Sequence, residues 1–303
     1  MPSSVRRASG KGVSMKNKHS APRVLFPRTV GEAIELAISE PNAVYWAGGT
    51  ILAGSSGSSD LLLLPRTVIS LGLVEELAKA SRSEHNLEIG AMMTLDRLAS
   101  IGRSVLPVAL PEAIATIGNR PIRCRATLGG HLAASSGFGD LRTLLQILDA
   151  VAETRFLRDR KRRRKPVAAA RKLPVGRLEA ESGLRRGELV TKIIIPTGNW
   201  NLGDFRRIGP DPASPRKIIF AGLARVEKGM LAEWRMAFSS GDSIVRDREL
   251  EIGLSGRPLP MSSKELDTVE DSVEATAERS GLDEYGRRVV ANLARGFLRK
   301  AAG

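Results

Sequence analysis

The sequence predicts a protein of mixed helix and sheet, built from two or three packed units. Short strand patterns alternate with short helical patterns from residue 23 to about residue 200. From about residue 203, two long strand patterns are followed by two amphipathic helical patterns. The chain has 303 residues and 42% hydrophobic content, which exceeds the roughly 100–200 residues of a usual single domain and is enough to fill separate cores.

Composition limits the kinds of site that the chain can carry. The longest apolar runs, such as Leu61–Leu64, are far shorter than the ~20 residues that cross a bilayer, and the basic start lacks the apolar core of a secretory signal. We therefore expect a soluble, cytoplasmic protein. The single cysteine, Cys124, cannot supply the roughly four thiolates of an iron–sulfur cluster. The three histidines lack zinc-type spacing, so no metal site is expected.

Two basic blocks account for the formal net charge of +14. Met1–Ser20 holds five Lys or Arg and no acid, and Arg155–Lys172 holds ten against Asp159. The second block has no interleaved aromatic residues for base stacking, so a solvated loop is favoured and nucleic acid is not expected as a partner. Residues 1–22 are predicted to be a disordered leader, with Met15 as a second candidate start.

The first two-thirds of the chain predict short elements with clear boundaries. Thr29 and Glu32 form a capping-box pattern at the start of a helix. Thr94 and Asp140 are expected to cap the helices that follow them, and Pro111 opens another. The expected strands are Ala43–Trp46, Thr67–Leu71, Leu87–Ala91, Val151–Leu157 and Leu189–Ile195. The expected helical segments are Val74–Ala80, Leu95–Ile101, Glu112–Ile117 and Leu141–Asp149. The basic block is then a loop between two strands.

The last third predicts a separate sheet-and-helix unit. Lys217–Lys228 and Met230–Phe238 have strand patterns, and Lys228-Gly229 between them is a hairpin signal. Two amphipathic helices are expected at Lys264–Ser280 and Glu284–Ala301. This unit is expected to begin near residue 203.

Two glycine turns, Ala47–Thr50 and Thr127–Gly130, are the candidate phosphate-binding segments. A diphosphate needs backbone N–H groups directed into one concavity, and glycine permits close approach and positive φ. Each turn is expected to offer amides and a hydroxyl. A single Gly-Gly pair is most often a plain tight turn, so the pair of turns together with Asp140 is the stronger signal. Neither turn fits the Rossmann or P-loop pattern, and those sites are not supported.

An ordered series of segments carries a family resemblance: Ala47–Thr50, Leu87–Ala91, Asn119–Ala133, Asp140-Leu141, Leu148–Ala150, Gly187–Val190 and Ile195-Pro196. In order and spacing they are similar to the FAD-binding (medium) subunits of molybdenum hydroxylases of the xanthine dehydrogenase and carbon monoxide dehydrogenase type. The resemblance covers about residues 23–300.

The resemblance implies an α+β fold and a role in electron transfer. A PCMH-type (vanillyl-alcohol-oxidase-like) FAD-binding domain would span residues 23–200, with subdomains 23–80 and 81–200 holding FAD between them. A C-terminal flavoprotein domain would span residues 201–303. Electrons would come from [2Fe–2S] clusters on a small partner, while substrate is hydroxylated at the molybdopterin cofactor of a large partner. The chain would pass the electrons to NAD or another acceptor, as the flavin subunit of an oxidoreductase.

The resemblance also assigns roles to single residues. The segment that wraps the diphosphate would be Ala47, Gly48, Gly49, Thr50, Ile51 and Leu52. The second phosphate-side loop would be Thr127, Leu128, Gly129, Gly130 and His131. Asp140 would accept a hydrogen bond from a ribose hydroxyl, and Thr94 would lie in a loop that borders the flavin. Ile117 and Val190 would pack against the cofactor rings, although ordinary core packing is an equal interpretation.

Three positions depart from the family pattern. Ile51 stands where a polar or acidic residue is usual, His131 stands in place of asparagine, and Arg206 stands in place of lysine. A guanidinium does not simply replace an ammonium, so flavin tuning at Arg206 is open. Two other functions are considered: a stand-alone flavin reductase or oxidase, and a degenerate flavin fold that acts as a basic interaction protein.

Overall fold

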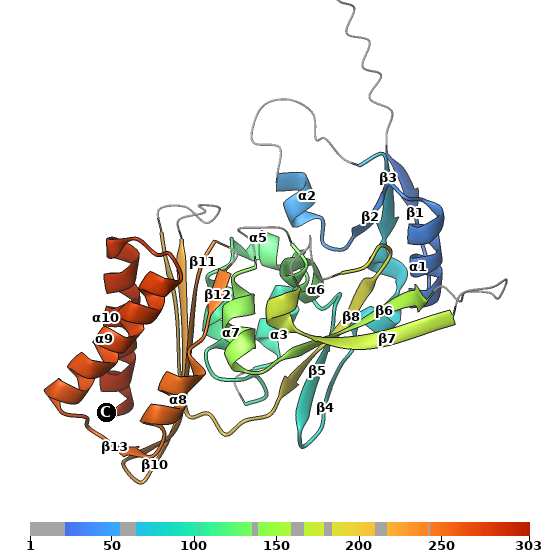
Figure 1. Ribbon diagram of the computed structural model, residues 1–303. Helices are drawn as coiled ribbons and strands as arrows, with labels where there is room; N and C mark the ends of the chain where they lie inside the picture. The colour runs from blue at the N-terminus through green and yellow to red at the C-terminus, as the bar shows by residue number, and fades with distance from the viewer. Residues whose placement is uncertain are drawn as a thin grey trace, which may run out of the picture.

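Three β-sheets organise the part of the chain that the computed structural model describes, which is residues 22–54, 65–102, 104–134, 139–158, 167–178, 184–209, 217–241 and 243–303. Each sheet is built from a consecutive stretch of sequence, and helices lie beside all three (Figure 1). The predicted mixed helix-and-sheet class is confirmed. The predicted leader, up to residue 21, and the centre of the basic block, residues 159–166, lie outside the described residues.

The first sheet is parallel, with the order β1 (Arg23–Leu25), β3 (Thr67–Ser70), β2 (Ala43–Trp46). Helix α1 (Val30–Ser39) packs its buried Val30, Ala33 and Ile34 against it. Thr29 caps α1 as predicted, but the Glu32 carboxylate accepts from the N–H of Arg28, so the predicted capping box is only half formed. Two 3-10 turns, Leu71–Leu73 and Glu75–Ala78, replace the single helical turn expected after β3.

The second sheet is antiparallel, with the order β4 (Ala80–Arg82), β5 (Asn86–Gly90), β8 (Leu189–Pro196), β6 (Val151–Arg158), β7 (Val167–Pro174). Short helices from the described residues contribute to its core: α3 (Leu95–Ser100), α4 (Leu110–Ala115), α6 (Leu128–Leu132) and α7 (Leu141–Ile147). Helix α5 (Arg120–Arg123) precedes α6 and has no buried residue. The fully buried Ile89, Leu144 and Ile193 belong to this central core.

Strand β7 corrects the prediction that the whole basic block is a loop. Arg155 lies in β6, while Arg171 and Lys172 lie in β7, which pairs with β6 along its full length. The strand was missed because its residues Ala168–Ala170 have weak strand propensity and because dense charge hides the alternation.

The third sheet has the order β12 (Ser243–Val245), β11 (Met230–Ser240), β10 (Ile218–Glu227), β9 (Leu202–Ile208), and β13 (Arg257–Pro258) pairs with β11. The predicted hairpin between β10 and β11 is confirmed. Lys228 and Gly229 both have positive φ, 51° and 74°, as a tight hairpin turn requires. A short helix, α8 (Arg248–Leu254), precedes the two long helices α9 (Ser263–Arg279) and α10 (Glu284–Ala301), which match the prediction closely.

The third sheet lies between two cores. Helices α9 and α10 cover one face, where Trp234, Phe238 and Phe297 are buried. On the opposite face, Phe205 and Ile219 belong to the central core. Helix α7 lies on that side of the sheet (Figure 1). This packing ties the C-terminal sheet closely to the second sheet and its helices. The expected domain limits at residues 23, 80, 200 and 303 stay predictions.

Candidate functional site

The first glycine turn has a backbone that only glycine fits. Strand β2 ends at Trp46, and Ala47-Gly48-Gly49 leads into the short helix α2 (Thr50–Gly54). Gly49 has φ +72°, and an added Cβ would lie 2.3 Å from the Trp46 ring. A Cβ at Gly48 would lie 1.9 Å from the carbonyl oxygen of Arg125. Within the described ranges, the N–H groups of Gly48 and Gly49 donate to no protein acceptor, so they are available to an anionic ligand.

The second glycine turn differs from the prediction, because its amides are already used. Thr127 caps α6, and its Oγ1 accepts from the N–H of Gly130 at 3.2 Å. The N–H of Leu128 donates to Met93 and that of Gly129 donates to Ala91, both at 2.8 Å. The expectation that this turn offers amides is therefore wrong for Leu128, Gly129 and Gly130, while the Thr127 hydroxyl accepts a bond and can still donate one. The sequence could not show that β5 and the residues after it would approach so closely.

The two glycine turns meet, although residues 51–126 separate them in the sequence. A Cβ at Gly130 would lie 3.5 Å from the Cβ of Ala47, and Gly48 packs on the backbone of Arg125 and Ala126. Thr94, which caps α3, forms an isolated β-bridge with Thr127. The structure thus brings Ala47–Thr50, Thr94 and Thr127–Gly130 into one place.

Ile117 and Val190, which are predicted to pack against the cofactor rings, lie in or beside the central core. Val190 in β8 is 5% exposed and belongs to the central core, and Ile117 is partly buried against it. Ile51 and Leu52 are half-buried on α2. These positions are compatible with the core-packing interpretation, and contact of Ile117 and Val190 with a cofactor stays a prediction.

Asp140 does not cap α7, so that prediction is wrong. Its buried carboxylate instead binds the Lys217 ammonium through Oδ1 and forms an ion pair with Arg207 Nε at 3.0 Å through Oδ2. Both cations come from the third sheet or its immediate start, far along the chain. Local sequence patterns carry no signal for such a pair. The predicted ribose contact competes with these two cations and stays a prediction.

His131 is buried in α6 rather than exposed on a loop. Its Nε2 accepts from the N–H of Leu141 at 3.4 Å. Burial lowers the pKa of His131 to about 4, the Asp140 carboxylate opposes that shift, and Lys217 and Arg142 add to it. The imidazole is therefore neutral near pH 7.

Arg206 and Arg207 point to opposite faces of β9. Arg206 is exposed and pairs with Asp204 at 3.2 Å, on the face that Lys300 of α10 also approaches. Arg207 reaches Asp140 on the other face. The role that the resemblance gives to Arg206 stays a prediction. Arg207 was not predicted as a site residue. Side chains alternate between the two faces of a strand, and this alternation could have placed Arg207 on the face opposite to Arg206.

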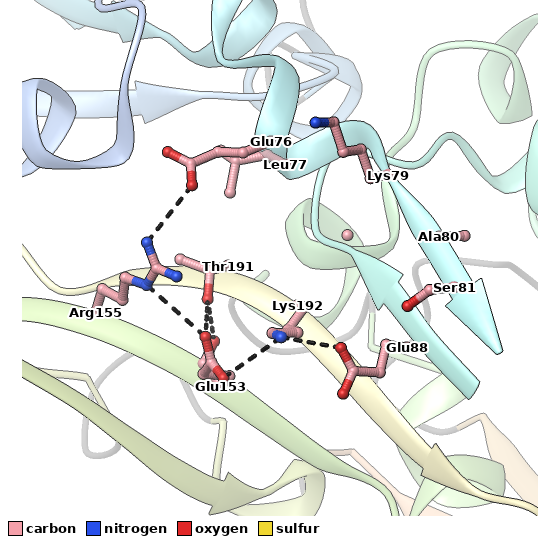
Figure 2. A pocket seen from close by; sticks show the side chains of 11 residues that line it. Glu76, Leu77, Lys79, Ala80, Ser81, Glu88, Glu153, Arg155, Thr191 and Lys192 are labelled. Atoms are coloured by element: carbon pink, nitrogen blue, oxygen red, sulfur yellow. Dashed lines mark hydrogen bonds and ion pairs between the residues drawn. The ribbon is translucent and has the colours of Figure 1, made fainter. Parts of the chain in front are cut away.

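A second candidate site is a cavity of about 150 Å³ on the second sheet (Figure 2). Charged side chains line it, and these pair with one another. Lys192 contacts Glu88 at 2.9 Å and Glu153 at 3.7 Å, and Arg155 contacts Glu76 at 3.5 Å. The hydrogen bond with Glu88 raises the pKa of Lys192. Each carboxylate has a cation partner, which indicates a structural ion-pair network rather than a catalytic acid or base.

The described ranges carry neither a metal-binding cluster nor a membrane-spanning helix. They contain no group of three or more His, Cys, Asp or Glu side chains that could hold a metal ion. They also contain no helix with the length and hydropathy needed to cross a membrane.

The structure brings two glycine turns together, outside the Rossmann and P-loop patterns, and the first turn presents amides suited to an anionic group such as a phosphate. The chain belongs to the family described as the FAD binding domain in molybdopterin dehydrogenase, whose sequence profile matches residues 17–198. Its cofactor is FAD, and it is an oxidoreductase component. The predicted family and cofactor are confirmed.

Individual relatives show how the family uses this unit. The chain is 26% identical over 241 residues to the nicotine 6-hydroxylase medium subunit of Paenarthrobacter nicotinovorans, covering 78% of this chain and 75% of that one. It is 25% identical over 242 residues to aldehyde oxidase 4 of Mus musculus, covering 76% of this chain but only 17% of that much longer protein. A chain of reconstituted CO dehydrogenase from Oligotropha carboxidovorans has the same fold, with TM-score 0.75, 19% identity, and 93% and 98% coverage. The predicted PCMH-type fold is confirmed.

Proposed function

We propose that the chain is the FAD-binding electron-transfer subunit of a molybdenum hydroxylase complex. The observation that carries the proposal is the first glycine turn, where the amides of Gly48 and Gly49 have no protein acceptor in the described ranges, in a chain of the molybdopterin dehydrogenase FAD family. The medium-subunit relative supports a separate flavin chain that works in a complex. The proposed location is the cytoplasm.

The proposed partners follow from this role. A small partner would hold [2Fe–2S] clusters and deliver electrons, and a large partner would hold molybdopterin and the substrate. NAD or another acceptor would then take the electrons from this chain. FAD supplies the redox chemistry when bound, and the protein supplies position and surroundings.

The residues of the first turn fit the diphosphate of FAD. Gly48 and Gly49 offer two N–H donors, and no described residue bonds to the Thr50 hydroxyl beside them. The second turn contributes a fixed wall rather than amide donors, because the N–H groups of Leu128, Gly129 and Gly130 bind Met93, Ala91 and Thr127. Ile51 adds no polar side chain. We therefore expect the backbone of the first turn to provide most of the diphosphate binding.

Binding by the first turn can be tested with two glycine variants. Gly49→Ala should bind FAD at least ten-fold more weakly, because alanine is strained at φ +72° and its Cβ meets the Trp46 ring. Gly281→Ala is the matched control, since Gly281 has φ +83° and open space around it. Absorption spectra during FAD titration, with chromatography of the released cofactor, measure the affinity of both.

Equal FAD affinity in Gly49→Ala and the wild type would contradict the assignment of this turn. A wild-type chain that binds no FAD at all would instead favour the degenerate, basic interaction protein. Melting temperatures of both variants separate lost binding from lost folding.

A further inference from the structure

The joint between α6 and α7 links the second glycine turn to the third sheet. We define this joint as His131, Leu141 and Asp140. His131 Nε2 accepts from the N–H of Leu141, whose side chain is fully buried. The adjacent Asp140 binds Lys217 and Arg207. Contacts thus run without interruption from the third sheet through α7 to α6.

The joint requires one particular form of the imidazole. Nε2 can accept only when the ring is neutral and its proton is on Nδ1. Burial and the nearby cations Lys217 and Arg142 disfavour a charged ring, and Asp140 is the one charged group that favours it among those facing His131 in the described ranges. A side chain without an acceptor would leave the N–H of Leu141 buried and unbonded.

The position of α6 matters because this helix forms one wall of the glycine site. Gly130 directly precedes His131 in the chain and lies against Ala47. The residues just before the turn, Arg125 and Ala126, lie against Gly48. A shift of α6 would therefore change the space beside the Gly48 and Gly49 amides.

We propose that His131 is a positioning residue for the FAD site, which holds the second glycine turn against the first through its neutral Nε2. The inference rests on the proposed function, since it concerns the affinity for FAD. A positioning role differs from a merely structural one in its effect on FAD. Removal of the Nε2 acceptor should weaken FAD binding, whereas removal of another buried hydrogen bond of α7 should not.

Nitrogen NMR of the histidine rings tests the joint without FAD. The chain has three histidines, His19, His85 and His131. The ring signals that are present in the wild type and missing in His131→Gln therefore belong to His131. We expect a neutral ring with the proton on Nδ1 at pH 7. A ring protonated on Nε2, or on both nitrogens, would overturn the inference whatever the affinity for FAD.

Titration with FAD tests the consequence. His131→Gln keeps an acceptor near the place of Nε2 and should bind FAD within about two-fold of the wild type, whereas His131→Leu should bind about ten-fold more weakly. Thr143→Val is the matched control, because Thr143 Oγ1 donates a buried bond of 2.9 Å from α7 to Ser239 of β11. It should lower the melting temperature and leave the FAD affinity unchanged.

Wild-type affinity in His131→Leu, or an equal loss of affinity in Thr143→Val, overturns the inference. If His131→Leu does not fold, the inference is supported when His131→Gln folds and binds FAD. If neither variant folds, the inference is overturned. A wild-type chain without FAD binding overturns the proposed function and this inference together, while wild-type binding with an unaffected His131→Leu overturns the inference alone.

Discussion

Gly49 meets two independent constraints, one from its backbone and one from its neighbour. Its positive φ disfavours any side chain, and the Trp46 ring occupies the space where a Cβ would lie. The sequence identified the residue through the strand that precedes it. It could not show that Gly48 packs on Arg125, because that contact depends on how two distant segments fold together.

His131 should make the stability of the chain depend on pH. Its pKa is about 4 in the folded protein, below the ordinary value of about 6.5, so the unfolded chain binds more protons between these values. Stability is therefore complete above about pH 6.5 and falls by up to about 3 kcal/mol as the pH drops toward 4.

Urea unfolding at several pH values measures this effect. The difference in free energy of unfolding between the wild type and His131→Gln should change between about pH 6.5 and about pH 4, since glutamine does not titrate. Parallel pH profiles for the two proteins would show that His131 is not buried in its neutral form.

Elements with a strong local signal were predicted well. The hairpin of β10 and β11 and the helices α9 and α10 have regular periodicity and clear boundaries. Strand β7 lacked such a signal and was missed, because pairing with β6 rather than its own composition makes it a strand. The cap predicted at Asp140 failed for a similar reason, since distant cations bind that carboxylate.

The capping box at the start of α9 gives a prediction at the scale of an element. Ser262 Oγ accepts from the N–H of Glu265 at 3.3 Å, and the Glu265 carboxylate accepts from the N–H of Ser262 at 2.9 Å. Ser262→Ala should cost about 1 kcal/mol and lower the melting temperature. Ser272→Ala, in the interior of the same helix, should be nearly neutral. Equal melting temperatures for the two variants would contradict a stabilising cap.

Helix α7 joins the sheets of the whole molecule through a carboxylate at each end. Asp140 binds Lys217 and Arg207, while Asp149, just after the helix, accepts from Arg235 at 2.5 Å and from Arg246 at 2.7 Å. All four cations belong to the third sheet or the segments beside it. The resemblance predicted that the chain contains these units, but it did not predict the ion pairs that lock them together.

Removal of one cation should destabilise the whole molecule. Lys217→Met leaves the buried Asp140 with Arg207 as its remaining described ion-pair partner, and should cost about 3 kcal/mol. The double variant Asp140→Asn with Lys217→Met should recover part of that loss, because the buried carboxylate charge is then absent, although Arg207 also loses its ion-pair partner. A double-mutant cycle by urea unfolding measures the coupling, and strictly additive losses would show that the pair does not stabilise the fold.

The central claim is that the chain carries FAD inside a molybdenum hydroxylase complex. The most direct test is to purify the tagged chain from its native host and to measure flavin, molybdenum and iron in the product. We predict that FAD is bound to this chain and that two further chains accompany it, one with molybdenum and one with iron. A chain that is purified alone and without flavin would contradict the account.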